Sequence, residues 1–128
     1  MRLLLDTHAA LWWINDDKRL SAAARRAIAR PDSVRLFSLA SAWEITIKSS
    51  LGKLRLPLSA GKFLEEHLPV NRIELLPITF GELTRVEVLP FHHRDPFDRM
   101  IAAQALERDL TLVSIDSVFE RYGLKRVW

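Results

Sequence analysis

The strongest constraint on the fold is a segment near the C-terminus, DPFDRMIAAQALERDLTLVSID, which occupies residues 95–116. Asp95 is a favourable helix N-cap and Pro96 suits the first helical position, so the pattern predicts a helix over Asp95–Asp109. The polar side chains that this helix leaves for solvent are only Gln104, Glu107 and Arg108. Such a helix is largely buried, and the apolar run Thr111–Ile115 follows it as a buried strand.

The rest of the chain alternates short apolar runs with helical segments in the same way. Strands are predicted over Arg2–Leu5, Val34–Ser38 and Ile73–Ile78, with an edge strand at Leu124–Trp128. Helices are predicted over His8–Asn15, Ser21–Arg30, Ser41–Leu51, Ser59–Leu68, Thr79–Val88 and Ser117–Tyr122. This alternation favours an α/β class: a three-layer α/β/α domain with a central parallel sheet of four to five strands. No repeat or linker-like stretch occurs, so we expect a single domain over residues 1–128.

Composition excludes several classes of protein. The chain has 128 residues and no cysteine, which rules out a disulfide scaffold, a thiolate zinc site and a cysteine nucleophile. No apolar run reaches the roughly 18 residues of a membrane span, and Asp6 and His8 interrupt the N-terminus where a signal peptide would be apolar. We therefore expect a cytoplasmic protein with no membrane contact. A net charge of +3 is compatible with a polyanionic partner but does not identify one.

Acidic side chains fall where a parallel sheet collects its ligands. Asp6 directly follows the first predicted strand and Asp116 the strand near the C-terminus, so both face the carboxyl edge of the sheet. Glu44 and Asp98 lie in the first turns of predicted helices, which often open on the same edge. We expect these acids to converge. Converging carboxylates repel one another unless a hard divalent cation such as Mg²⁺ or Mn²⁺ neutralises them.

A metal ion at this edge would give the chemistry of a nuclease. It would activate water and stabilise negative charge on a phosphodiester. The basic side chains expected to line such a site are Lys48, Lys53, Arg94 and Arg99.

Each acid also has a purely structural explanation. The sequence Ser41-x-x-Glu44 matches a capping box, in which the glutamate serves only the helix N-terminus. Asp98, like Asp95, can stabilise the start of its helix, and Asp6 and Asp116 can cap the helices that follow them. Capping does not require the same strand-end placement to recur, so the convergence of all these acids favours a site.

Other candidate residues give weaker signals. The histidines that could contact a metal or a phosphate are His8, His92 and His93. Their spacing matches no ligand motif, which favours a surface or hydrogen-bonded role. The tryptophans that could stack on bases are Trp12, Trp13, Trp43 and Trp128. Trp12 and Trp13 have apolar neighbours and are expected to pack in a core or an interface.

Three segments of the chain resemble the PIN-domain ribonucleases and, within them, the VapC toxins of bacterial type II toxin–antitoxin pairs. They are LLLDTHAALWW, SLASAWEITIKSSLGKL and LPFHHRDPFDRMIAAQALERDLTLVSID. They run in the order and spacing of that family and cover nearly the whole chain. The most specific part is DPFDRMIAAQA followed by a strand and an aspartate.

The resemblance implies which residues form the site. The family's catalytic and metal-binding acids fall on Asp6, Glu44, Asp98 and Asp116. Thr7 matches a polar residue after the first acid, and Ser114 keeps a hydroxyl where the family often has threonine. Asp95 is an additional acid, either a supporting residue or a cap.

The resemblance also implies an activity and its partners. It implies Mg²⁺ or Mn²⁺, hydrolysis of RNA by water to a 5′-phosphate and a 3′-hydroxyl, and a homodimer. It further implies a cognate VapB-type antitoxin whose C-terminal segment covers the acidic site, so that DNA is contacted only indirectly through the antitoxin. The RNA that is cut, and whether one metal or two are held, stay open.

Rival functions make different demands on the sequence. A haloacid-dehalogenase phosphatase needs a second acid two residues after Asp6, where this chain has His8. A receiver domain needs an acid pair at the end of the first strand, and only Asp6 is present. A catalytically silent PIN-like module that binds RNA or protein is the remaining alternative, although all the acids of the motif are kept.

Overall fold

A five-stranded parallel sheet forms the middle layer of the protein, and the structure, a computed structural model, describes residues 1–128. The strands are β1 (Arg2–Leu5), β2 (Val34–Ser38), β3 (Ile73–Leu76), β4 (Thr111–Val113) and β5 (Lys125–Val127). Their order in the sheet is β3-β2-β1-β4-β5. In this register Leu5 pairs with Phe37 on one side and with Val113 on the other. The segments that leave β1, β2 and β4 therefore emerge side by side at one edge.

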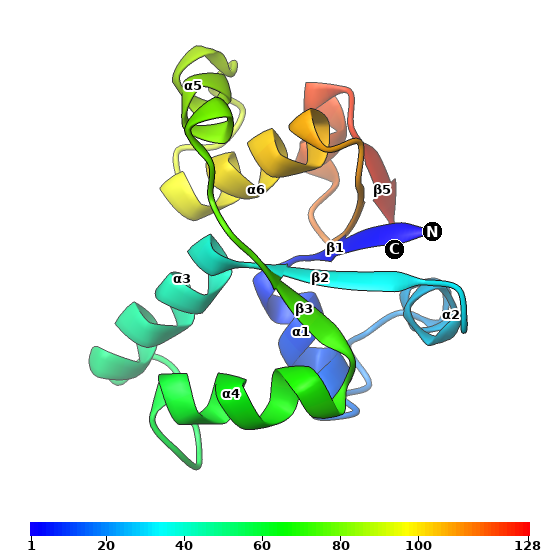
Figure 1. Ribbon diagram of the computed structural model, residues 1–128, viewed down its shortest axis with the longest axis vertical. Coiled ribbons are helices and arrows are strands. Elements are labelled where there is room, and N and C mark those ends of the chain that lie inside the picture. The colour runs from blue at the N-terminus through cyan, green and yellow to red at the C-terminus, as the bar shows by residue number, and fades with distance from the viewer.

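Helices cover both faces of this sheet (Figure 1). They are α1 (Thr7–Ile14), α2 (Ala22–Ala29), α3 (Leu39–Ser50), α4 (Ala60–Val70), α5 (Phe80–Val88), α6 (Pro96–Glu107) and the 3₁₀ helix η1 (Ser117–Tyr122). Successive strand residues point to opposite faces, so Leu3 and Leu5 pack with α1, α2 and α4, whereas Leu4 packs with α6 and η1. The predicted three-layer α/β/α architecture is confirmed. None of these helices has the length and apolarity needed to span a membrane.

Several element boundaries differ from the predicted ones. Helix α3 begins at Leu39, because the Ser38 hydroxyl at the end of β2 accepts a hydrogen bond from Ala40 N–H at 3.0 Å and caps the helix directly. The predicted capping box of Ser41 and Glu44 is therefore wrong, since neither residue lies at a cap. Helix α4 continues through Pro69, which costs one backbone hydrogen bond but has a φ compatible with a helix.

Strand β4 ends earlier than predicted, and the reason bears on the site. The chain turns at Ser114, whose hydroxyl accepts a hydrogen bond from Asp116 N–H at 3.1 Å. Asp116 thus follows β4 after a short turn rather than directly.

One residue of α6 that was predicted to face solvent is buried instead. Gln104 was expected to be exposed but is fully buried, and its amide donates hydrogen bonds to Glu82 and to the carbonyl oxygen of Pro77, both at 3.2 Å. Helix α5 lies beside α6 and covers this side (Figure 1). The all-round burial of α6 is thus more complete than its sequence indicates.

Candidate active site

Asp6 stands at the end of the central strand and is held from two sides. Its backbone N–H continues the sheet by donating to the Val113 carbonyl oxygen at 3.0 Å. Its carboxylate caps α1, accepting from Thr7 N–H at 2.8 Å, and its other oxygen accepts from the Ser114 hydroxyl at 2.7 Å. Burial nevertheless raises the pKa of Asp6, outweighing these hydrogen bonds. The carboxylate is fixed in direction but lacks a positive partner.

Glu44 reaches the same edge from the second turn of α3. The Thr7 hydroxyl donates to Glu44 Oε1 at 2.7 Å, and Lys48 Nζ donates to Oε2 at 2.6 Å. Only 8% of the Glu44 side chain is exposed. The ion pair raises the pKa of Lys48. Glu44 is therefore a buried acid that Thr7 orients and Lys48 neutralises.

Asp98 lies in the first turn of α6 and is the least compensated acid of the protein. Asp95 caps this helix, accepting from the N–H groups of Phe97 and Asp98 at 2.7 and 3.1 Å. The Asp98 carboxylate itself takes part in no hydrogen bond or ion pair. Burial, followed by repulsion from Asp95 and Asp6, raises the pKa of Asp98 to about 7. A cation bound beside this carboxyl group would stabilise its ionised form and lower its pKa.

Both carboxylate oxygens of Asp116, the last acid of the predicted set, have hydrogen-bond partners. One carboxylate oxygen accepts from Val118 N–H at 3.0 Å and so caps η1, while the other lies 2.7 Å from His93 Nε2. Burial pushes the pKa of Asp116 up, but the hydrogen bonds from His93 and Val118 outweigh it and hold the pKa below its usual value. The structure thus separates an uncompensated pair, Asp6 and Asp98, from two compensated acids, Glu44 and Asp116.

His93 is the residue of this edge whose role the sequence did not reveal. Its ring lies between Asp116 and the Tyr122 hydroxyl, and 9% of its side chain is exposed. Of the roles considered for this histidine, the hydrogen-bonded one is correct. The only signal in the sequence is its position in the loop directly before Asp95.

One of the basic residues expected at the site belongs to the fold instead. The Arg99 guanidinium is buried and donates to the carbonyl oxygens of Pro90, Val86 and Leu89 at 2.8–3.2 Å. Helical periodicity turns Arg99 away from Asp98 and towards the end of α5. The placement of Arg99 in a positive lining is therefore wrong. Lys53 and Arg94 are exposed.

The tryptophans divide into two groups. Those that pack against the core are Trp12, Trp13 and Trp128. Trp43 is 63% exposed and meets the ring of Phe97 edge-on, with 5.5 Å between ring centroids. Each of these two aromatic residues directly precedes an acid of the site. An aromatic pair, in which Trp43 is exposed and Phe97 partly buried, therefore borders the acidic edge.

A family model for the PIN domain matches residues 3–125. The chain belongs to the PIN domain family. It is 30% identical over 115 residues to Ribonuclease VapC22 from Mycobacterium tuberculosis, covering 89% of this chain and 86% of that protein. The resemblance found in the sequence is confirmed.

Solved structures agree with this assignment. The toxin–antitoxin complex VapBC2 of Rickettsia felis, bound to a DNA fragment from its promoter, contains a similar chain with a TM-score of 0.73 and 17% identity. The match covers 98% of this chain and 97% of that one. DNA-bound VapBC of Salmonella typhimurium gives a TM-score of 0.67 at 19% identity, covering 98% and 96%. At these identities the likeness establishes the fold.

The acids of this PIN domain fit a hard divalent cation by the chemistry of their donors. Asp6 and Asp98 offer carboxylate oxygens that form no ion pair, and burial raises the pKa of both. No three carboxylate or imidazole groups surround one point as a closed ligand set. Mg²⁺ typically needs no such cage, because it binds through one or two carboxylates and keeps several waters.

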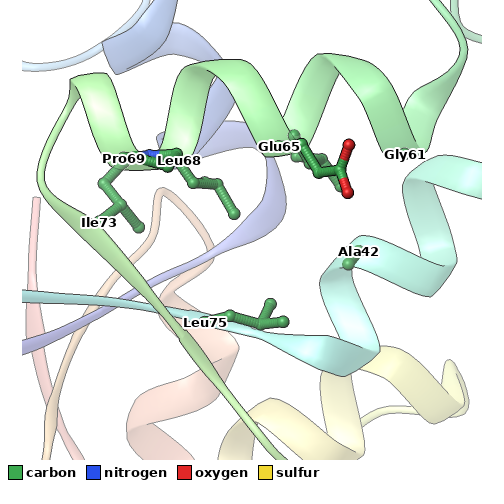
Figure 2. Close-up of a pocket in the computed structure, with 8 residues that line it drawn as sticks. Ala42, Gly61, Glu65, Leu68, Pro69, Ile73 and Leu75 are labelled. Atoms are coloured by element: carbon green, nitrogen blue, oxygen red, sulfur yellow. The ribbon is translucent and has the colours of Figure 1, made fainter.

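An apolar groove lies on another part of this PIN domain. It has a volume of about 400 Å³ and runs between α3 and α4 beside the edge strand β3. Figure 2 shows Ala42, Leu68, Ile73 and Leu75 around it, with the Glu65 carboxylate at its side. None of the four predicted acids lines the groove.

Proposed function

We propose that this chain is a VapC-type toxin, an endoribonuclease that hydrolyses RNA phosphodiester bonds with a divalent metal ion and is inhibited by a cognate antitoxin. The observation that carries this proposal is the uncompensated pair Asp6 and Asp98 at the carboxyl edge of a PIN domain. Neither of these carboxylates, whose pKa values are raised, forms an ion pair, and Mg²⁺ or Mn²⁺ would supply a cation in direct contact with them. The family relationship to a protein named a ribonuclease supports RNA as the substrate.

The acids have separate tasks in this mechanism. Asp6 and Asp98 would hold the ion, with Ser114 and Thr7 fixing the direction of Asp6. When bound, Mg²⁺ or Mn²⁺ lowers the pKa of water and stabilises negative charge on the phosphodiester. Glu44, oriented by Thr7, faces the same edge and would bind the ion or accept a hydrogen bond from water bound to it.

Asp116 completes the anionic edge without being free itself. Its carboxylate accepts hydrogen bonds from Val118 N–H and from His93, which fix its direction towards a metal ion that would bind at this edge. Asp95 caps α6 and adds negative potential beside Asp98. Cleavage is expected to leave a 5′-phosphate and a 3′-hydroxyl.

The surroundings of the site favour a single-stranded polyanion. The exposed ring of Trp43 next to Glu44 offers a stacking surface for an unpaired base. Lys53 and Arg94 are exposed and can contact phosphates. A small phosphomonoester would use neither feature.

The partner in this proposal is a VapB-type antitoxin. The apolar groove between α3 and α4 suits an amphipathic segment of that protein, and DNA binding would belong to the pair. Leu75 is 49% exposed and lines the groove, so Leu75→Glu is expected to weaken inhibition by co-expressed antitoxin. Val34→Glu, at a strand residue 40% exposed and outside the groove, is the matched control. A homodimer is part of the same proposal.

The decisive test of the activity is cleavage of single-stranded RNA in Mg²⁺ or Mn²⁺. Wild-type protein should cut RNA but not p-nitrophenyl phosphate, and Asp6→Ala and Asp98→Ala proteins should be folded but inactive. Wild-type rates in either variant would refute the proposed site. Growth arrest that persists on expression of Asp98→Ala would instead indicate a silent module that harms the cell by binding.

A further inference from the structure

The loop before α6 carries His93, whose ring makes a hydrogen bond at each nitrogen. Nε2 lies 2.7 Å from Asp116 Oδ2, and Nδ1 lies 2.9 Å from the Tyr122 hydroxyl. The same hydroxyl lies 3.0 Å from the backbone nitrogen of His93. These contacts join the loop, η1 and the acidic edge.

Counting donors and acceptors determines where the ring proton lies. The backbone N–H of His93 can only donate, so the Tyr122 oxygen accepts from it. The Tyr122 oxygen then either donates its single proton to Nδ1 or accepts from Nδ1 with its second lone pair. Only the first arrangement uses the hydroxyl proton within these contacts. Asp116 as a carboxylate can only accept, so Nε2 must carry the proton that lies between them. All of these contacts are satisfied at once by a neutral histidine protonated at Nε2.

The ring is also fixed in its plane. It stacks on Tyr122 with an interplanar angle of 11°, and its centroid lies 4.4 Å from that of Phe119. Phe119 is fully buried, which anchors this side of the ring in the core. His93 therefore has little freedom to turn its Nε2–H away from Asp116.

The contacts of His93 continue to the centre of the site. Asp116 N–H donates to the Ser114 hydroxyl, and that hydroxyl donates to Asp6 Oδ2 at 2.7 Å. A continuous series of hydrogen bonds thus runs from Tyr122 through His93 and Asp116 to the aspartate at the end of β1.

We propose that His93, held in the Nε2–H form by Tyr122, is a positioning residue that fixes the Asp116 carboxylate relative to Asp6. Neither ring nitrogen is free for a ligand, so His93 does not bind the metal itself. The effect on RNA cleavage rests on the proposed function, whereas the proton position and the direction of Asp116 do not. The alternative is that His93 only ties the loop to η1 by packing.

The first experiment needs neither metal nor RNA. Long-range ¹⁵N–¹H correlation spectra of metal-free protein should show His93 protonated at Nε2 and unprotonated at Nδ1. Tyr122→Phe removes the donor to Nδ1 but keeps the stacking ring, so the Nδ1 resonance should shift while the fold is unchanged. A ring protonated at Nδ1 in the wild type would overturn the assignment.

The second experiment separates positioning from packing. His93→Leu keeps an apolar contact with Phe119 but loses the donor to Asp116, whereas His93→Gln keeps an amide N–H that reaches the same carboxylate. Removing a partner that orients a metal ligand typically costs about 10–100-fold in metal affinity or activity. We therefore expect His93→Leu to lose about tenfold or more in Mn²⁺ affinity and in kcat, with KM little changed, and His93→Gln to recover part of both.

The outcomes of these variants are distinct. Equal Mn²⁺ affinity and kcat in the leucine and glutamine variants would leave His93 a packing residue only. If His93→Leu does not fold, Tyr122→Phe provides the same comparison through the His93 spectrum and Mn²⁺ affinity. If the wild type binds Mn²⁺ but cuts no RNA, the proposed function fails while the Mn²⁺ affinities still decide the role of His93.

Discussion

The two ends of α6 lie beside acids in opposite states: Asp98, which is partly buried, and Glu82 of α5, which is buried. At the N-terminal end, the Asp98 carboxylate accepts no hydrogen bond and forms no ion pair, and its pKa is raised to about 7. At the C-terminal end, Arg108 and Gln104 of α6 both reach Glu82 of α5, which is only 1% exposed. Burial raises the pKa of Glu82, but these hydrogen bonds and one from Thr79 outweigh it, so its pKa lies below the usual value.

This contrast separates burial from function. The more deeply buried acid, Glu82, is the one that behaves as an ordinary carboxylate, because the fold provides its partners. The pKa of Asp98 is raised because the fold provides no hydrogen-bond or ion-pair partner for its carboxylate. The candidate ligand site is therefore marked by the acid without a hydrogen-bond or ion-pair partner, Asp98, and not by the more deeply buried acid, Glu82.

The largest expected effect is on stability at the C-terminal end of the helix. Glu82→Ala leaves the buried Gln104 amide and the partly exposed Arg108 guanidinium without their acceptor. Breaking a buried ion pair by removing one partner typically costs about 3–5 kcal/mol. Urea unfolding should register this loss, while kcat per folded molecule stays near the wild-type value. If Glu82→Ala kept its stability but lost kcat, Glu82 would belong to catalysis and the contrast with Asp98 would be wrong.

At the other end of α6 the same kind of change should act on catalysis. Asp98→Ala is expected to lower RNA cleavage at least about 100-fold, since even residues that only orient a metal ligand are worth about 10–100-fold. Asp95→Asn is the matched control, because asparagine keeps the cap on Phe97 N–H. Single-turnover cleavage in Mg²⁺ should separate the two variants by more than about tenfold.

Asp98 and Glu82 should make the free energy of unfolding depend on pH with opposite signs. In metal-free protein Asp98 has a pKa of about 7 against an ordinary value of 3.8, so between these values the native state holds more protons than the unfolded state. The free energy of unfolding therefore falls as pH rises from 4 to 7. Asp98→Asn should remove this fall and stabilise the protein near pH 7.

Glu82→Gln provides the contrasting measurement. The lowered pKa of Glu82 gives stability that is present above its ordinary value of 4.5 and is lost as pH falls through the native pKa. The variant should thus be less stable than wild type at pH 7, and the difference should shrink in acid. Urea titrations in EDTA from pH 3 to pH 8 test both variants, and equal slopes for Asp98→Asn and wild type would contradict the raised pKa of Asp98.

Local patterns predicted the N-terminal end of α6 better than its C-terminal end. Asp95, Pro96 and Asp98 lie within one turn, so capping rules could locate them at the start of the helix. The partners of Gln104 and Arg108 lie 22 and 26 residues away on α5, and no local rule predicts how two helices dock. Gln104 was therefore assigned to solvent although it is fully buried.

Distance along the chain explains the other differences as well. Arg99 was placed at the site from its neighbour Asp98, but the turn of the helix directs it to carbonyl oxygens at the end of α5. His93 and Asp116 are 23 residues apart, so their contact depends on how η1 folds back on the loop. The expected convergence of the acids depended on strand ends and on the first turns of helices, and the binding of an ion there stays a prediction.

The smallest expected effect concerns the aromatic pair at the N-terminal end of α6. Stacking of one base on an aromatic ring is worth about 1–3 kcal/mol by alanine substitution. One edge of Trp43 already packs on Phe97, so we expect the lower end, about 1 kcal/mol or roughly fivefold in Kd for single-stranded RNA. Fluorescence anisotropy with Asp98→Asn protein in EDTA measures binding without cleavage.

Leu51→Ala is the matched control for Trp43→Ala, since Leu51 is 62% exposed at the end of the same helix. If Trp43 contacts RNA, only the tryptophan variant weakens binding, and an oligonucleotide with an abasic site near the cut should reduce the difference. If both variants bind RNA alike while Trp43→Ala weakens binding of the antitoxin, the exposed ring belongs to a protein interface. The N-terminal end of α6 would then concentrate metal binding and inhibition, and substrate affinity would depend on exposed charges such as Lys53 and Arg94.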